Sequence, residues 1–138
     1  MSVRKGDQDE GKLQVIEAAK NLLVYTYDKC VGKTFPKAER FLLPSSIWYE
    51  AQKAHGKIVR ANRLKVTNKL EAEERLLLEE EAVGHLDELG YLIDASHAIG
   101  KITDDQADFW TGLNATTQKL ALKWLKSQRE DYKEFLKE

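Results

Sequence analysis

Few side chains in this 138-residue chain have the type and spacing that catalysis or metal binding requires. His55, His85 and His97 are far apart in sequence, and the chain contains neither the HExxH pattern of zinc sites nor the Glu-x-x-His pattern of di-iron bundles. Cys30 is the single cysteine, so it has no thiol partner within the chain and is interpreted as a structural thiol. The sequence therefore predicts no enzyme activity, no metal and no cofactor.

Three further candidates for chemistry also have simpler interpretations. Residues 32–34 (GKT) lack the upstream glycine and the preceding strand of a phosphate-binding loop. The three glutamates at 79–81 are consecutive and cannot share one helix face, so they are expected to be solvated. His85 lies in an apolar stripe and is expected to be a hydrogen-bonded core residue.

The composition indicates one water-soluble helical domain. Hydrophobic residues make up 42% of the chain and charged residues 33%, with only 2 prolines and 8 glycines. The first residues are polar, without the apolar region of a signal peptide, and no apolar run approaches the roughly 20 residues that span a membrane. We expect a cytoplasmic protein that does not enter the membrane.

Apolar residues at helical spacing predict four long helices, at about 10–31, 44–66, 70–98 and 103–136. Residues 1–9 are expected to form a flexible N-terminus, and residues 10–138 the folded domain. Pro36 is expected to open a short helical turn. Thr103 and Gln106 have capping-box spacing. Because the loops are short, the fold class is predicted to be all-α, an antiparallel up-down-up-down four-helix bundle.

The apolar stripes identify the core that these helices should share. In the first helix the stripe is Leu13, Ile16, Ala19, Leu23, Tyr27 and Cys30. In the second helix it is rich in alanine and consists of Ile47, Ala51, Ala54, Ile58 and Ala61. In the fourth helix, Trp110 and Trp124 fall near one face and are expected to pack in the core.

Opposite charges are segregated around one predicted hairpin. The acidic side, 71–88, holds eight acids and one base, Arg75. The basic side has no acid, and its cations are Lys53, Lys57, Arg60, Arg63, Lys65 and Lys69. Two interpretations stay open: the two sides pair with each other within the chain, or the basic residues face outward and bind nucleic acid or an acidic partner.

Two adjacent aromatic residues, Trp48 and Tyr49, diverge by about 100° on a helix. One of them should therefore leave the core of its own subunit. An outward aromatic beside an alanine-rich stripe suggests a surface for self-association. The sequence predicts an oligomer interface at Trp48 and Tyr49.

Several motifs resemble one family of four-helix bundles, the accessory variability determinants of diversity-generating retroelements, related to bundle proteins encoded in ribosomal-RNA intervening sequences. The similar segments are "FPKAERF", a following helix that ends in "IVRANR", and a closing hairpin from "LIDASHAIG" to "LKWLKS". The matching residues of the hairpin are Gly100, Ile102, Thr103, Gln106, Trp110, Leu120 and Trp124. The resemblance extends over about residues 10–128.

This resemblance implies a non-catalytic homopentameric ring. In the retroelement branch, it implies a basic surface that binds the reverse transcriptase and its template RNA and supports mutagenic cDNA synthesis. The candidate nucleic-acid contacts are then the six cations of 53–69. Trp48, Tyr49, Gly90 and Asp94 stand where retroelement members often carry arginines. The alternative is a ring-forming interaction protein of the ribosomal-RNA branch with no retroelement role.

Overall fold

The computed structural model describes the backbone of residues 5–137 and the side chains of residues 14–137. Within these residues all regular structure is helical. The elements are α1 (Lys5–Val31), η1 (Lys37–Glu39), α2 (Leu43–Arg63), α3 (Lys69–Ala98), α4 (Asp104–Asp131) and α5 (Lys133–Leu136). Part of the predicted flexible segment, residues 1–4, lies outside the described residues, and α1 already begins at Lys5 instead of near Glu10.

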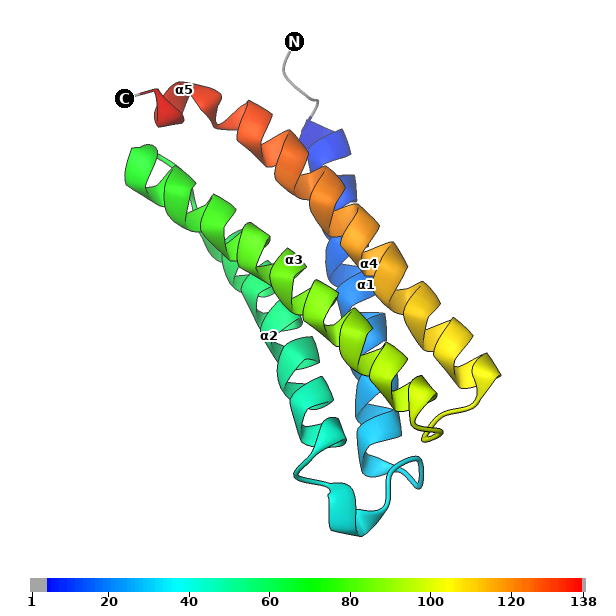
Figure 1. Ribbon diagram of the computed structural model, residues 1–138. Helices are drawn as coiled ribbons and strands as arrows, with labels where there is room; N and C mark the ends of the chain where they lie inside the picture. Colours follow the sequence, from blue (N-terminus) through cyan, green and yellow to red (C-terminus); the bar gives the residue numbers. More distant parts are fainter. Residues whose placement is uncertain (1–4, 138) are drawn as a thin grey trace.

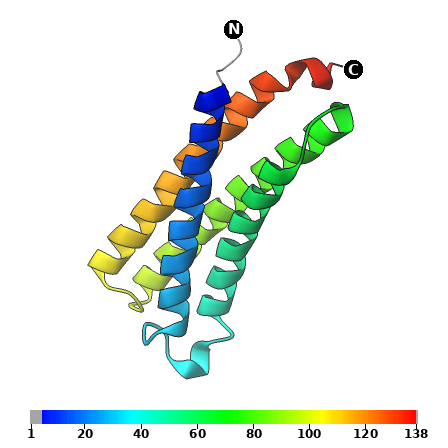
Figure 2. The ribbon, with the colours of Figure 1, turned by 180° about the vertical axis from the view of Figure 1, so that it is seen from behind.

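The four long helices pack together around one core. Helix α1 contacts α2 and α4, and α3 contacts the same two helices. The link from α1 to α2, which contains η1, lies at the same end of the molecule as the link from α3 to α4 (Figure 1). The link from α2 to α3 lies at the other end, beside α5, and the view from behind shows the same arrangement (Figure 2). Among the described residues, no helix combines the length and apolarity needed to cross a membrane.

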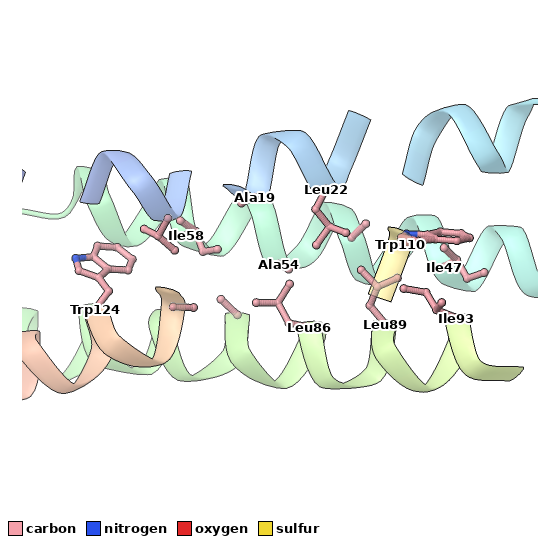
Figure 3. Packing of buried hydrophobic residues seen from close by; sticks show 14 of the residues in the cluster. Ala19, Leu22, Ile47, Ala54, Ile58, Leu86, Leu89, Ile93, Trp110 and Trp124 are labelled. Carbon is pink, nitrogen blue, oxygen red and sulfur yellow. The ribbon is translucent and has the colours of Figure 1, made fainter. Parts of the chain in front are cut away.

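The core follows the predicted stripe closely in α2 and less closely in α1. All five predicted α2 residues are buried, and so are Trp110 and Trp124, which lie toward opposite ends of the core with Leu86 and Leu89 between them (Figure 3). Among the α1 side chains that the structure describes, from residue 14 onward, the most buried are Val15, Ala19, Leu22 and Thr26.

The predicted α1 stripe was wrong at Tyr27, which is 54% exposed, while its neighbour Thr26 is buried. The reason is a polar contact that apolar periodicity cannot detect. The indole N–H of Trp110 donates to Thr26 Oγ1 at 3.0 Å, and this hydroxyl donates to the Leu22 carbonyl at 2.7 Å. Threonine is therefore fully paired at this core position.

Local sequence features explain where the helices begin and end. The capping box at Thr103 and Gln106 is confirmed, because each side chain bonds the backbone N–H of the other residue. Asn68 caps α3 by accepting from the Glu71 N–H at 2.9 Å. Helix α2 ends at Arg63, earlier than predicted, because Leu64 is extended (φ −78°, ψ 116°).

Candidate functional site

Four of the six predicted nucleic-acid contacts lie on the molecular surface. Lys53, Arg60, Arg63 and Lys65 are exposed, and none of them forms an ion pair with a described residue. The first three share one face of α2, because positions 53, 60 and 63 are separated by two turns and by three residues. Lys65 follows just after the end of this helix. We call these four residues the basic surface.

The other two predicted contacts are engaged within the chain. Lys57 on α2 pairs with the Glu81 carboxylate on α3, and the hydrogen bond from this ammonium group lowers the pKa of Glu81. Lys69 lies 4.0 Å from Glu73 Oε1, one turn further along α3. Pairing across the hairpin therefore accounts for Lys57, while the basic surface remains available to an external anion.

The basic surface borders a shallow hollow on α2 of about 240 Å³. Its lining includes Lys53, Lys57, Arg60 and Gly56, which lies between the cations. A Cβ atom on Gly56 would meet no atom within 4 Å, so packing inside this chain does not require a glycine there. An interior glycine is less favourable than alanine in a helix by about 1 kcal/mol, and Gly84 and Gly112 are equally open at this atom.

Tyr49 lies near the N-terminus of α2, on the helix face that carries the hollow. Of the adjacent aromatic residues Trp48 and Tyr49, it is the one that points outward. Its side chain is 51% exposed, and Lys53 Nζ lies 5.4 Å from its ring centroid. Trp48 is half-buried, with its ring 5.6 Å from the Tyr27 ring. The structure thus separates the two predicted interface residues: Tyr49 faces solvent, whereas Trp48 packs against α1.

Sequence reasoning missed a second outward aromatic region, between α1 and α4. A groove of about 640 Å³ is lined by the apolar side chains of Val24, Tyr25, Phe109 and Leu113, with Lys20, Asn21 and Asp28 at its border. Val24 is 61% exposed and Phe109 57% exposed, although the Phe109 ring lies 4.9 Å from that of Tyr25. An apolar surface of this kind is typical of a protein contact. Val24, Tyr25 and Phe109 were missed because they lie beside the predicted helical stripes, whereas Leu113 lies on the stripe of the fourth helix.

The largest correction concerns the glutamates at 79–81, which were expected to be solvated. Glu79 is only 2% exposed, whereas Glu80 pairs with Arg129 on α4 and Glu81 pairs with Lys57. Glu79 Oε2 lies 3.6 Å from Arg75 Nε, which is too long for a hydrogen bond, and neither carboxyl oxygen has a hydrogen-bond partner among the described residues. Residue spacing could have revealed this, because the stripe through Ala82 extends back to Glu79.

Burial raises the pKa of Glu79 to about 8, and the nearby Arg75 charge offsets only part of this shift. The carboxyl group is therefore mainly protonated at neutral pH. Arg75 is stabilised mostly by other groups: its guanidinium lies 5.6 Å from the rings of Trp124 and Tyr132, and its Nη1 donates to the Leu64 carbonyl at 3.0 Å. This buried cluster joins α3, α4 and the start of α5.

His85, His97 and Cys30 each have a hydrogen-bond partner within the chain. His85 is half-buried instead of in the core, with Nδ1 2.6 Å from Glu50 Oε2, and His97 Nε2 lies 2.6 Å from Asp104 Oδ1. Burial raises the pKa of Cys30 to about 12, which disfavours the nucleophilic thiolate. Within the described part of the chain, no group of three or more His, Cys, Asp or Glu residues is placed to hold a metal ion.

No protein-family model, curated protein or solved structure matches this chain. Two surfaces of the molecule are candidate binding sites, the basic surface of α2 and the outward aromatic residues. The first has the charge to bind an anion, and the second has the apolar area to bind protein.

Proposed function

We propose that this chain is a non-catalytic binding subunit, an antiparallel up-down-up-down four-helix bundle that assembles into a homo-oligomeric, pentameric ring. In this proposal the ring is an accessory subunit of a diversity-generating retroelement and binds the reverse transcriptase and template RNA. The observation that carries the RNA part is the basic surface: four exposed cations without an intramolecular ion pair among the described residues.

The form of the hollow supports a nucleic acid as the ligand. Lys53 and Arg60 flank the open position at Gly56, so a phosphate group can approach the helix closely between two cations. Because only four cations are available, we expect modest affinity with a strong dependence on salt.

A filter-binding titration with a structured RNA tests this part of the proposal. The purified protein should bind at low ionic strength, and binding should weaken steadily as salt is added. The absence of salt-dependent binding at low ionic strength would overturn the RNA role.

The assembly part of the proposal is supported by the exposed aromatic residues. Tyr49→Ala should reduce the fraction of oligomer without unfolding the subunit, because this ring is half exposed in the single chain. Trp48→Ala should also weaken the ring, through the orientation of α2 against Tyr27. Light scattering on the unmutated protein checks the premise, and a monomer at micromolar concentration would contradict it.

Two observations favour the second candidate, a ring-forming interaction protein of the ribosomal-RNA intervening-sequence branch. The pairing of Lys57 with Glu81 and the net charge of −1 both reduce the attraction for a polyanion. The adjacent genes distinguish the two candidates. A neighbouring reverse transcriptase with a repeat pair favours the retroelement role, and a location inside a ribosomal-RNA gene favours the alternative.

A further inference from the structure

Two adjacent apolar side chains, Phe41 and Leu42, are exposed on the link between α1 and α2. Phe41 is 77% exposed and Leu42 64% exposed, and the link forms one end of the molecule (Figure 1). Single exposed apolar residues are normal on a protein surface, but a continuous apolar area bordered by polar residues is typical of a contact site. We call these two residues the apolar tip.

The fold itself does not require the apolar tip. The link is held in place by Phe35, which is 6% exposed and belongs to the core, and by Glu39, whose carboxylate lies 3.0 Å from Lys101 Nζ. These contacts fix the link while the tip stays exposed. A tip that is already held in position loses little conformational freedom on binding, which favours association.

Two cations of the same link accompany the apolar tip. Lys37 and Arg40 are exposed, and neither forms an ion pair with a described residue. The Arg40 guanidinium lies 4.7 Å from the centroid of the Phe41 ring, so the charge and the ring form one surface. Aromatic residues and arginine are enriched at protein interfaces. The tip is therefore suited to an apolar groove with an acidic border.

The groove between α1 and α4 has this character. The apolar side chains that line it are Val24, Tyr25, Phe109 and Leu113. Asp28 lies at its border, and the exposed Asp105 precedes Phe109 by one turn on the same face of α4. Lys20 also lies at the border, but its Nζ is 3.5 Å from a carboxylate oxygen of Glu17, which offsets its charge.

The stability of α1 does not account for the acid at position 28. Asp28 lies in the last turn of α1, where the helix dipole favours cations and disfavours acids. Its side chain is 72% exposed, and its carboxylate lies 3.5 Å from Nζ of the adjacent Lys29, an exposed pair of the kind that contributes little to stability. A cation from outside the chain gives this carboxylate a role that the helix does not.

We propose that the apolar tip of one copy of this chain docks into the α1/α4 groove of a second copy. Phe41 and Leu42 then cover the apolar lining, and the two cations beside them face Asp28 and Asp105. A second copy is the occupant because the chain itself carries a surface that matches the groove in apolar character and in charge.

The tip and the groove are two different surfaces of the subunit. Each copy can therefore bind one neighbour through its tip and another through its groove, which is the head-to-tail contact that a closed ring requires. This contact would hold together the homo-oligomer proposed above, on which the inference rests. It is separate from the surface around Tyr49.

Two variants test the contact by size-exclusion chromatography with light scattering. Phe41→Ser/Leu42→Ser removes the tip, and Val24→Lys places a cation in the groove that repels Lys37 and Arg40. All three substituted residues are more than half exposed, so the subunits should stay folded, and circular dichroism checks this. We expect each variant to raise the dissociation constant of the oligomer at least about tenfold, because a few anchor residues carry most of the energy of an interface.

Mixing the two variants in equal amounts tests the pairing itself. The tip variant keeps an intact groove and the groove variant keeps an intact tip, so the mixture can form one native contact. We expect a heterodimer at a concentration at which each variant alone is monomeric. A mixture of folded variants that stays monomeric would contradict the pairing of tip and groove.

A control separates this contact from a general loss of apolar surface. Leu70→Ser/Leu77→Ser removes two exposed apolar side chains from α3 and should leave the oligomer unchanged, and an equal loss there would overturn the inference. An oligomer that persists in both the tip and the groove variants also overturns it, but leaves the proposed ring standing on other surfaces. A monomeric unmutated protein would overturn the ring and the inference together.

Discussion

The exposed cations of α2 and the buried Arg75–Glu79 cluster of α3 show two ways in which this bundle uses charge. Arg60 and Arg63 are exposed on an outer face, without intramolecular ion pairs among the described residues. Arg75 is 9% exposed and contacts two aromatic rings and a carbonyl oxygen, beside a carboxyl group that is 2% exposed. Arginines of the same hairpin therefore have different roles: the outer ones are available to a ligand, and the inner one holds helices together.

The two regions differ in what they cost the fold. An exposed charge keeps its hydration and contributes little to stability, whereas a buried charge loses hydration and needs compensating contacts. Stability should therefore respond strongly to substitutions in the buried cluster and weakly to those on the basic surface. Ligand binding should respond in the opposite order.

The largest effect is expected for Arg75→Ala. We predict that this variant lowers the free energy of unfolding by about 3 kcal/mol, because it removes the bond to the Leu64 carbonyl and two ring contacts and leaves a cavity beside Glu79. Arg63→Ala, an exposed arginine of α2, is the matched control and should change it by less than about 0.5 kcal/mol. Urea unfolding at pH 7 measures both. Equal effects would remove the distinction between the two regions.

The next effect is a dependence of stability on pH through Glu79. Its pKa is about 8 in the folded protein and near 4.5 when unfolded, so between these values the folded state holds a proton that the unfolded state has lost. The contribution of the Glu79 proton to the free energy of unfolding is fully present below about pH 4.5. It is lost as the pH rises toward 8, by up to about 1.4 kcal/mol per pH unit.

Glu79→Gln tests this prediction, because glutamine has nearly the same shape and does not titrate. Between pH 5 and 8 the unfolding free energy of the variant should fall less steeply than that of the unmutated protein. Glu80→Gln, at an exposed position beside it, should leave the slope unchanged. Parallel curves for all three proteins would contradict the raised pKa of Glu79.

A smaller difference in unfolding free energy is expected between alanine substitutions at Gly56 and at Gly90. Gly56→Ala should raise the unfolding free energy by about 1 kcal/mol, because the new Cβ meets no neighbour and alanine favours the helix. Gly90→Ala should be at least about 1 kcal/mol less favourable than Gly56→Ala, since its Cβ presses on the Asn114 amide that bonds Leu86. Thermal or urea unfolding compares the two variants. A gain of equal size at both positions would show that Asn114 adjusts freely.

Sequence reasoning predicted the apolar part of the fold well and the polar part poorly. The stripe from Ile47 to Ala61 and the cap at Thr103 depend on local spacing, which the sequence displays directly. The burial of Thr26 depends on the Trp110 indole, 84 residues away, and no local pattern contains that contact. Glu79 was missed because the three consecutive glutamates were treated alike as solvated, although position 79 lies three residues before buried Ala82 on the same face.

The candidate site was also predicted only in part, because it too depends on contacts between helices. The cluster of cations at 53–69 was visible in the sequence, but which of them would be paired was not, because pairing depends on how α2 and α3 are aligned. That alignment places Glu81 beside Lys57 and leaves Arg60 and Arg63 exposed.

The smallest effect on stability, below about 0.5 kcal/mol, is expected for the double variant Arg60→Glu/Arg63→Glu, although it should have the largest effect on RNA binding. Lys119→Glu/Lys126→Glu, at exposed positions of α4, changes the net charge by the same amount and serves as its control.

Filter binding of a structured RNA to these two variants and the unmutated protein, across a range of salt concentrations, tests the central claim most directly. We predict that Arg60→Glu/Arg63→Glu weakens binding at least about tenfold and reduces the slope of log affinity against log salt by about 2, while the α4 variant stays near the unmutated protein. Equal losses in the two double variants, or no salt-dependent binding by the unmutated protein, would contradict the account.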